Sequence, residues 1–198
     1  MSNRLNRPSR KEQTHERIVG VAARAIRRAG FNGVGVADIM KEAGLTHGGF
    51  YAHFESREAL LVEALQRASR DGGAALAEHV VAREAAGESR FKALVDAYLG
   101  DAQLDDIEGG CVVAALCADT PRQSEAVRAE GQRRVLAIVN AVRAALPSGA
   151  AGAAEVVTAT LVGAIQLARA LGGDAGRALL ARTRGQLLET YEASSHSG

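Results

Sequence analysis

The sequence VADIMKEAGLTHGGFYAHF, residues 36–54, has the pattern of two short helices joined by a tight turn. Gly44 is suited to end the first helix, and Thr46 is suited to cap a second helix over His47–Phe54. Apolar side chains of the first helix recur at helical spacing, at Val36, Ile39, Met40 and Ala43. The stretch therefore predicts a helix-turn-helix with the turn Gly44-Leu45-Thr46.

A helix-turn-helix places its second helix in the major groove of DNA, with the first residues of that helix against the base edges. Gly48 and Gly49 lack side chains and would let the backbone come close to DNA, whereas Phe50 and Phe54 share one face and are expected in the core. For Lys41 and Arg57, a DNA contact and ordinary surface charge are both open readings. The residues predicted to bind DNA are Thr46, His47, Gly48, Gly49, Tyr51, His53, Arg57 and Lys41.

The flanking residues predict further helices. An amphipathic helix is expected over Lys11–Ala29, capped by Ser9 and ended by Gly30 in a left-handed conformation. Ser56 is suited to cap another helix, whose pattern changes after Gly72-Gly73. The stretch from Val36 to Leu61, with the helix before it and the ending Gly30-Phe31, resembles the DNA-binding domain of the TetR family of repressors. Val36 departs from the family pattern, which has a Ser or Thr cap at that point.

The remaining chain is rich in Ala and Leu and poor in aromatic residues, which make up 4% of the whole sequence. Because such a composition favours helix over sheet, the sequence predicts an all-α fold. A three-helix DNA-binding head is expected over residues 1–55, and a larger helical body for ligand binding and dimerisation over residues 56–198. Helices of this body are expected near Ser89–Asp101, Gly110–Asp119, Pro121–Leu146, Ala150–Leu171 and Ala175–Ala193.

The resemblance implies a homodimer that binds a pseudo-palindromic operator in double-stranded DNA and is released by a small molecule held in the body. It also implies that the last two long helices form the dimer interface. The sequence supports this interface, because residues 155–171 are apolar or small on nearly every face. Whether the protein represses or activates transcription is left open.

An apolar or weakly polar effector is expected, since the body has few aromatic residues and few candidate buried charges. Its polar partners are expected to be Tyr98 and Gln166, although ordinary core packing is the favoured reading for each residue of the set. The predicted effector contacts are Phe91, Leu94, Tyr98, Val112, Leu116, Val135, Val139, Ile165 and Gln166.

Two cysteines, Cys111 and Cys117, are six residues apart. On a helix this spacing is a rotation of about 600°, so the two thiols point to different faces and no disulfide is expected. Cys111 follows Gly109-Gly110 at an expected helix start, where the helix dipole favours a thiolate. One reading makes Cys111 a redox or electrophile sensor of a repressor, and the other makes both cysteines small buried hydrophobes.

Charge is uneven along the chain. Residues 1–28 contain eight Lys and Arg but only Glu12 and Glu16, whereas the whole chain has a net charge of +1. A basic N-terminus is attracted to a phosphate backbone, with Arg10, Lys11 and Arg17 as non-specific contacts, although a solvated tail is an alternative.

The sequence also bears on the location of the protein and on other possible functions. The N-terminus has no apolar signal segment and the uncharged stretch before Arg169 is short, so a cytoplasmic protein with no membrane contact is expected. No metal site and no cofactor are expected. An enzyme with Cys111 or Cys117 as nucleophile and His79 as base, and a helical adaptor that does not bind DNA, are the competing readings.

Overall fold

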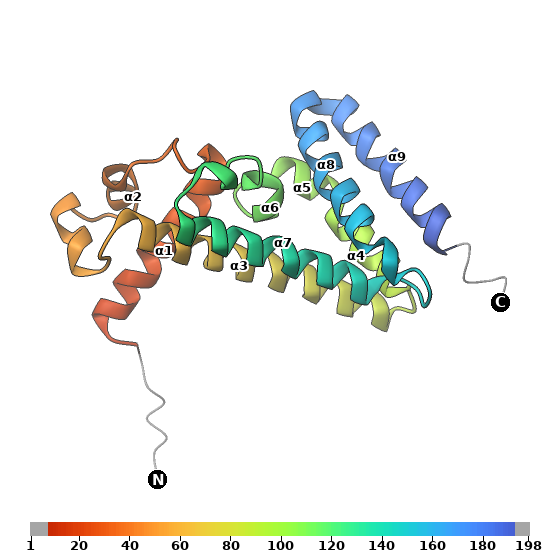
Figure 1. Ribbon diagram of the computed structural model, residues 1–198, viewed down its shortest axis with the longest axis horizontal. Helices are drawn as coiled ribbons and strands as arrows, with labels where there is room; N and C mark the ends of the chain where they lie inside the picture. Colours follow the sequence, from red (N-terminus) through yellow and green to blue (C-terminus); the bar gives the residue numbers. More distant parts are fainter. Residues whose placement is uncertain (1–7, 193–198) are drawn as a thin grey trace, which may run out of the picture.

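The computed structural model describes residues 8–192, and no strand occurs in that range. Arg4 and Arg7 of the basic N-terminus lie outside the described residues. Figure 1 shows an elongated molecule with α1 and α2 at one end and α8 and α9 at the other. The helices are α1 (Arg10–Ala29), α2 (Val36–Glu42), α3 (Arg57–Ala85), α4 (Arg90–Tyr98), α5 (Asp101–Asp105), α6 (Val112–Leu116), α7 (Glu125–Ala145), α8 (Ala154–Leu171) and α9 (Gly173–Glu192). Short 3₁₀ helices lie at His47–Ala52 (η1), Thr120–Arg122 (η2) and Ala151–Ala153 (η3).

The first helix forms as its sequence predicts. Ser9 Oγ accepts a hydrogen bond from the backbone N–H of Glu12 at 3.2 Å, and the Glu12 carboxylate accepts one from the Ser9 N–H at 2.7 Å. These two bonds make a capping box. The pKa of Glu12 is lowered because the Ser9 backbone N–H, and after it the Ser9 hydroxyl, bond the Glu12 carboxylate and favour its charged form. Gly30 ends the helix at φ 74°, but with an extended ψ of 175° in place of the expected left-handed helical value.

The change of pattern after Gly72-Gly73 does not end the long helix α3, which continues without interruption to Ala85. It starts at the Ser56 cap, whose Oγ accepts from the Ala59 N–H at 3.1 Å. It packs against α1, α4 and α7. In Figure 1, α3 and α7 run along each other through the middle of the molecule.

Two hydrophobic cores lie along the length of the molecule. The first joins α1, α2, η1 and the start of α3 with Val112, Val113 and Leu116 of α6 and Val127 of α7. The second joins α4 with α7, α8 and α9. Because α3 contributes buried side chains between Leu60 and Ala68 to the first core, and α6 contributes Val112, Val113 and Leu116, the head is packed directly against the body.

A second correction concerns Thr120-Pro121, which was expected to start a long helix. Thr120 and Pro121 form only the 3₁₀ turn η2, and α7 begins after Ser124. The Thr120 hydroxyl donates to the Leu116 carbonyl at 2.9 Å and does not cap a helix. The following helices keep their expected order, although α8 begins at Ala154 after the 3₁₀ turn η3.

Candidate nucleic-acid interface

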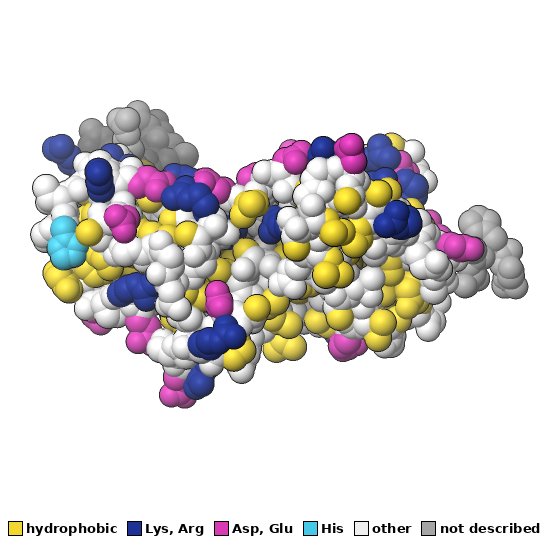
Figure 2. All heavy atoms as spheres, turned by 90° about the horizontal axis from the view of Figure 1, so that it is seen from above, with side chains coloured by type: hydrophobic (Ala, Val, Ile, Leu, Met, Phe, Trp, Pro, Cys, Tyr) yellow, Lys and Arg dark blue, Asp and Glu magenta, His cyan; other side chains and the backbone are white. Residues whose placement is uncertain are grey.

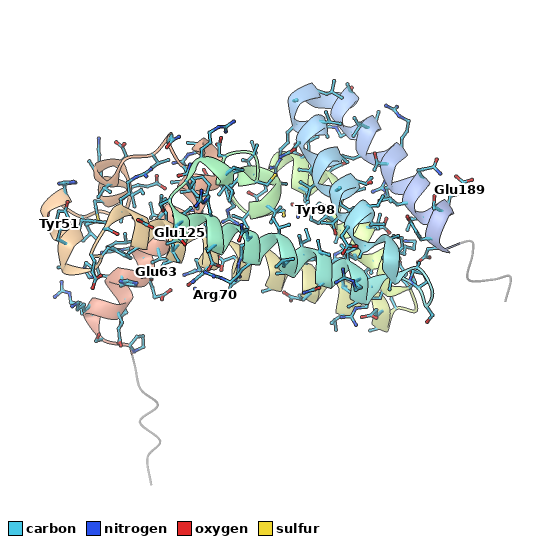
Figure 3. The ribbon with its side chains drawn as sticks, viewed as in Figure 1. Tyr51, Glu63, Arg70, Tyr98, Glu125 and Glu189 are labelled. Atoms are coloured by element: carbon cyan, nitrogen blue, oxygen red, sulfur yellow. The ribbon has the colours of Figure 1, made fainter. Side chains whose placement is uncertain are left out.

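The exposed surface of the helix-turn-helix is the first turn of η1. Thr46, His47 and Gly48 are exposed, and Gly49 is half-buried. Tyr51 is 72% exposed, an unusual state for a large aromatic side chain, and Figure 3 places it at the outer end of the head. A Cβ added to Gly48 would meet nothing within 4 Å, so no internal packing explains this glycine. These residues present a continuous backbone and side-chain surface to solvent.

Behind this surface lies an aromatic core, as the sequence predicts. Phe50 and Phe54 are 2% and 3% exposed, and their ring centroids are 5.4 Å apart in a stacked arrangement. The Tyr51 ring meets the edge of Phe50 at 5.2 Å. Ile39 of α2 is buried in the same core. Phe50 and Phe54 therefore fix η1 against α2, and Tyr51 extends outward from a rigid base.

The turn between α2 and η1 depends on one glycine. Gly44 has φ 70°, a value that L-residues rarely adopt, and its N–H donates to the Lys41 carbonyl at 3.0 Å. The next residue, Leu45, donates to the Met40 carbonyl at 2.8 Å and is half-buried. The tight turn predicted at Gly44-Leu45-Thr46 is thus present. Lys41 lies exposed on α2 next to it.

The caps of both short helices differ from the sequence prediction. The N-cap of α2 is Gly35, and Val36 is its first helical residue, so Val36 is not the cap position. The Asp38 carboxylate takes over one capping bond, because it accepts from the Gly35 N–H at 3.3 Å. Thr46 occupies the N-cap of η1, but its hydroxyl makes no capping hydrogen bond. This hydroxyl is therefore available for another partner.

Arg57 lies in a different environment from the rest of the predicted DNA-binding residues. Its guanidinium is half-buried, and Nη2 donates to the backbone carbonyl oxygens of Phe31 and, at 3.4 Å, Val34. The side chain thereby closes the loop between α1 and α2 from the start of α3. Sequence reasoning missed this contact, because nothing in the local pattern shows which distant carbonyls lack a partner.

Two histidines lie together behind η1. Of these, only His53 was predicted as a site residue, and His15 was not. His53, which follows η1, has a ring centroid 6.1 Å from that of His15 on α1, and the His15 ring stacks on Phe54 at 4.5 Å. His15 Nε2 lies 2.6 Å from the Glu63 carboxylate of α3. His53 Nδ1 is buried and has no hydrogen-bond partner among the described residues. Burial, with the positive charges of His15 and Lys11, holds the pKa of His53 below its ordinary value.

The surface of the head carries both basic and acidic side chains. Arg10, Lys11 and Arg17 are exposed along the first turns of α1, as expected for non-specific phosphate contacts. In Figure 2, Lys and Arg side chains are spread over the head among acidic ones, and hydrophobic side chains gather over the half of the molecule that contains α8 and α9.

Comparison with known proteins agrees with this geometry. The family model of the bacterial regulatory proteins of the tetR family matches residues 18–64, from α1 to the start of α3. The HTH-type transcriptional repressor NemR of Escherichia coli (strain K12) is 26% identical over 133 residues, 66% of this chain and 67% of NemR. The uncharacterized HTH-type transcriptional regulator YerO of Bacillus subtilis (strain 168) is 39% identical over 51 residues, 26% of this chain and 18% of that protein.

Solved structures share the whole fold. A TetR-family transcriptional regulator from Agrobacterium tumefaciens has a TM-score of 0.75 at 23% identity, over 91% of this chain and 98% of that chain. The reduced form of E. coli NemR has a TM-score of 0.70 at 22% identity, over 87% of this chain and 96% of that chain. The helix-turn-helix on an all-helical body defines a DNA-binding transcriptional regulator. Residues 18–64 match the tetR family of these regulators, and the chain as a whole shares the fold of solved structures from that family.

Proposed function

We propose that this regulator is a ligand-responsive repressor that binds a pseudo-palindromic operator as a homodimer. The observation that carries the proposal is the exposed first turn of η1, with Tyr51 extending from a buried aromatic base. In this proposal Thr46, His47, Gly48 and Gly49 face the base edges, and Tyr51 and His53 contact phosphates. Lys41 is close enough in sequence to the turn to add a phosphate contact. Arg57 acts by supporting the α1–α2 loop.

The test uses double-stranded DNA selected by the purified protein from a random library. The variants His47→Ala and Tyr51→Phe are expected to weaken binding to the selected site while the fold and the oligomeric state are retained. Unchanged binding in both variants would favour a helical adaptor whose η1 surface serves another partner. A reporter gene placed behind the selected site then separates repression from activation.

The proposed dimer interface is the outer face of α8 together with α9. Val156, Leu167 and Leu171 are 65%, 60% and 57% exposed, and they lie on one side of α8 at helical spacing. Between them, Thr160 and Gly163 are small, and a Cβ at Gly163 would meet nothing within 4 Å. Large exposed apolar residues at this spacing support contact with a second copy, as regulators of this family act as homodimers.

This helix also satisfies a simple criterion for a membrane span. Residues Ala151–Leu171 are long and apolar enough to cross a bilayer by length and composition, but 39% of the window is buried inside the structure. Val157, Leu161 and Ile165 of α8 are buried in the second core, which agrees with a core and interface helix. We infer a cytoplasmic protein that has no membrane contact. The substitution Leu167→Glu is expected to convert dimer to monomer in sedimentation velocity, and Glu78→Gln on the exposed side of α3 serves as the control.

The effector site is proposed in the body, around the predicted contacts. Seven of them are buried side chains of the two cores, namely Phe91, Leu94, Tyr98, Val112, Leu116, Val139 and Ile165. Val135 is 38% exposed and lines an open pocket of about 610 Å³ with Cys117, Arg128 and Leu136. The exposed Gln166 side chain donates to the Ala114 carbonyl at 3.0 Å and to Cys117 Sγ at 3.4 Å. A small apolar or weakly polar molecule suits these surroundings.

A second candidate, a repressor that senses oxidants or electrophiles through Cys111, is favoured by the polar group around this thiol. Cys111 is half-buried and free, and it lies beside the buried hydroxyl of Tyr98, which has no conventional hydrogen-bond partner among the described residues. Burial raises the pKa of Tyr98 well above its usual range, with a further contribution from Cys111 and an opposing one from Arg169. The helix α6 has only five residues, so its dipole adds little to thiolate formation, contrary to the argument from sequence.

The experiment for this candidate compares cysteine variants on the same DNA. Benzoquinone or hydrogen peroxide is expected to release the wild type and Cys117→Ser from the selected site, but not Cys111→Ser. Equal release of the wild type and Cys111→Ser would exclude Cys111 as the sensor. Release by a small molecule bound reversibly in the body would then be the remaining hypothesis.

A further inference from the structure

The segment between α5 and α6, residues Asp106–Cys111, lies between the head and the body. It is held in shape by its own hydrogen bonds. The Asp106 carboxylate accepts from the Gly109 N–H at 2.7 Å, and the Gly110 N–H donates to the Asp106 carbonyl at 3.0 Å. A Cβ added to Gly72 of α3 would lie 3.8 Å from the carbonyl oxygens of Gly109 and Gly110, so α3 passes directly beside it. We call residues 106–111 the α5–α6 segment.

On one side, the C-terminal part of α1 binds this segment through arginines. Arg27 is only 5% exposed, and its Nη1 donates to the Gly110 carbonyl at 3.3 Å. Arg28 Nη1 donates to the Glu108 carboxylate at 2.5 Å, and Arg24 Nε lies 3.9 Å from the same carboxylate. The head therefore meets the segment with three cationic side chains from a single helix.

Arg28 also continues the connection into the helix-turn-helix. Its second nitrogen, Nη2, bonds the Glu42 carboxylate at the end of α2 at 3.1 Å. Hydrogen bonds to Glu108 and Glu42 raise the pKa of Arg28, in that order of size. One guanidinium thus joins the last residue of α2 to the α5–α6 segment.

On the other side, Arg169 of α8 holds the segment. Its Nη2 donates to the Gln103 carbonyl of α5 at 2.8 Å. A Cβ added to Gly110 would come within 2.7 Å of the same nitrogen, so the Arg169 side chain lies against Gly110. Burial lowers the pKa of both Arg27 and Arg169, and the Asp106 carboxylate acts in the opposite direction on both. The buried guanidinium of Arg27 from the head and the half-buried guanidinium of Arg169 from the proposed dimer helix therefore share one acidic segment.

We propose that Glu108 and Arg28 are positioning residues for DNA binding, through which the α5–α6 segment fixes the direction of the helix-turn-helix relative to α8. This proposal rests on the proposed function as a dimeric repressor. In a dimer, the direction of each head sets the separation of the two recognition helices, and both must reach successive major grooves at once. Neither Glu108 nor Arg28 touches DNA in this role.

The test distinguishes a positioning residue from a residue that contacts DNA by comparing binding to a full site with binding to a half-site. A duplex that carries the full selected site requires both heads, whereas a duplex with one arm of it requires only one. Glu108→Gln is expected to weaken binding to the full site by about 5-fold to 10-fold, because heads that are no longer held in one direction lose conformational entropy when both bind DNA. The same variant is expected to change half-site binding by less than about 2-fold. Glu78→Gln removes the same charge from an exposed position of α3 and is expected to change neither value.

A double variant checks that the two residues act as a pair. Arg28→Gln combined with Glu108→Gln is expected to bind the full site as weakly as Arg28→Gln alone. Equal weakening of full and half sites, independent additive effects, or tighter binding to the full site would each overturn the proposal.

Hydrogen exchange without DNA gives an independent readout. Glu108→Gln is expected to speed amide exchange over residues 31–54 and leave α7 and α8 unchanged. Unchanged exchange over residues 31–54 would contradict the positioning role. If the wild type enriched no sequence from the library, the proposed function would fail, and the exchange data would still decide whether Glu108 holds the head.

Discussion

Arg57, the first residue of α3, donates a hydrogen bond to the backbone carbonyl of Phe31, which lies 26 residues earlier in the loop between α1 and α2. The same nitrogen reaches the Val34 carbonyl at 3.4 Å. Phe31 is fully buried, so its carbonyl has little access to water. The contact therefore ties the long helix of the body to the loop that sets the start of α2.

The first prediction concerns the stability that this contact provides. Arg57→Ala is expected to lower the free energy of unfolding by about 1–2 kcal/mol, because it removes charge-assisted bonds and leaves the Phe31 carbonyl unpaired. Urea unfolding followed by circular dichroism measures the change. Arg70→Ala, an exposed position of α3 that Figure 3 labels, is the control and should shift the midpoint little. If neither variant shifted the urea midpoint, Arg57 would again be a candidate DNA contact.

The second prediction concerns Tyr51, where stability and binding should separate. Tyr51→Phe keeps the ring that meets Phe50 and removes only a hydroxyl that faces solvent. We expect no change in the urea midpoint and about 3-fold to 10-fold weaker binding per half-site, the loss expected of one phosphate hydrogen bond. Fluorescence anisotropy on the selected DNA measures the affinity. The same affinity as the wild type would remove Tyr51 from the interface.

The surroundings of Tyr51 and Arg57 show which parts of the site the sequence could predict. The buried positions of Phe50 and Phe54 follow from helical spacing, because a short helix has one buried face and one exposed face, whereas the DNA contact predicted for Tyr51 rests on the family resemblance. Arg57 stands equally near the motif, but its partner is a carbonyl 26 residues away, and no local pattern reveals such an acceptor. The α5–α6 segment was recognised only as a Gly-Gly pair, since its role depends on Arg27 and Arg169 from two distant helices.

The third prediction is a pH dependence from His53. Its pKa in the folded protein lies below the ordinary value of 6.5, mainly because of burial and also because of His15 and Lys11. Between these two pKa values the unfolded chain binds a proton that the folded chain does not, so stability falls as the pH drops through 6.5. The Glu63 carboxylate also faces this histidine pair, through His15.

Urea unfolding at a series of pH values between about 7.5 and 5.5 tests the assignment. His53→Gln is expected to reduce the loss of stability over this range relative to the wild type, because glutamine has no proton to gain. His79→Gln, at an exposed position of α3, should keep the slope of the wild type. Identical slopes in wild type and His53→Gln would show that another group causes the pH dependence.

The fourth prediction concerns Glu130, a fully buried carboxylate of α7. It lies 2.5 Å from Arg133 Nη2 and 2.8 Å from Arg134 Nε, and Gln66 of α3 donates to it at 3.4 Å. Glu130→Ala is expected to lower the free energy of unfolding by about 2–4 kcal/mol, because it leaves a cavity and removes the partner of two cations. Arg133→Ala should cost less than about 1 kcal/mol, since that side chain is 56% exposed. Thermal unfolding measures both, and equal losses would contradict the burial argument.

The last prediction uses three glycines that look alike in the sequence. The helical pattern changes after Gly72-Gly73, yet α3 runs through this pair, because packing on α1, α4 and α7 outweighs the low helix propensity of glycine. A Cβ at Gly73 would meet nothing within 4 Å. Gly73→Ala is therefore expected to stabilise the protein by about 0.5–1 kcal/mol.

Gly110 should respond in the opposite direction. A Cβ there would lie 2.7 Å from Arg169 Nη2 and 2.9 Å from the Asp106 carbonyl oxygen, and this second atom belongs to the backbone. Gly110→Ala is therefore expected to destabilise the fold by about 1–3 kcal/mol, because the α5–α6 segment must shift to make room. Urea unfolding of the two variants gives the comparison. A stabilising effect of Gly110→Ala would mean that the segment is free to move away from α8, which is incompatible with its role in directing the helix-turn-helix.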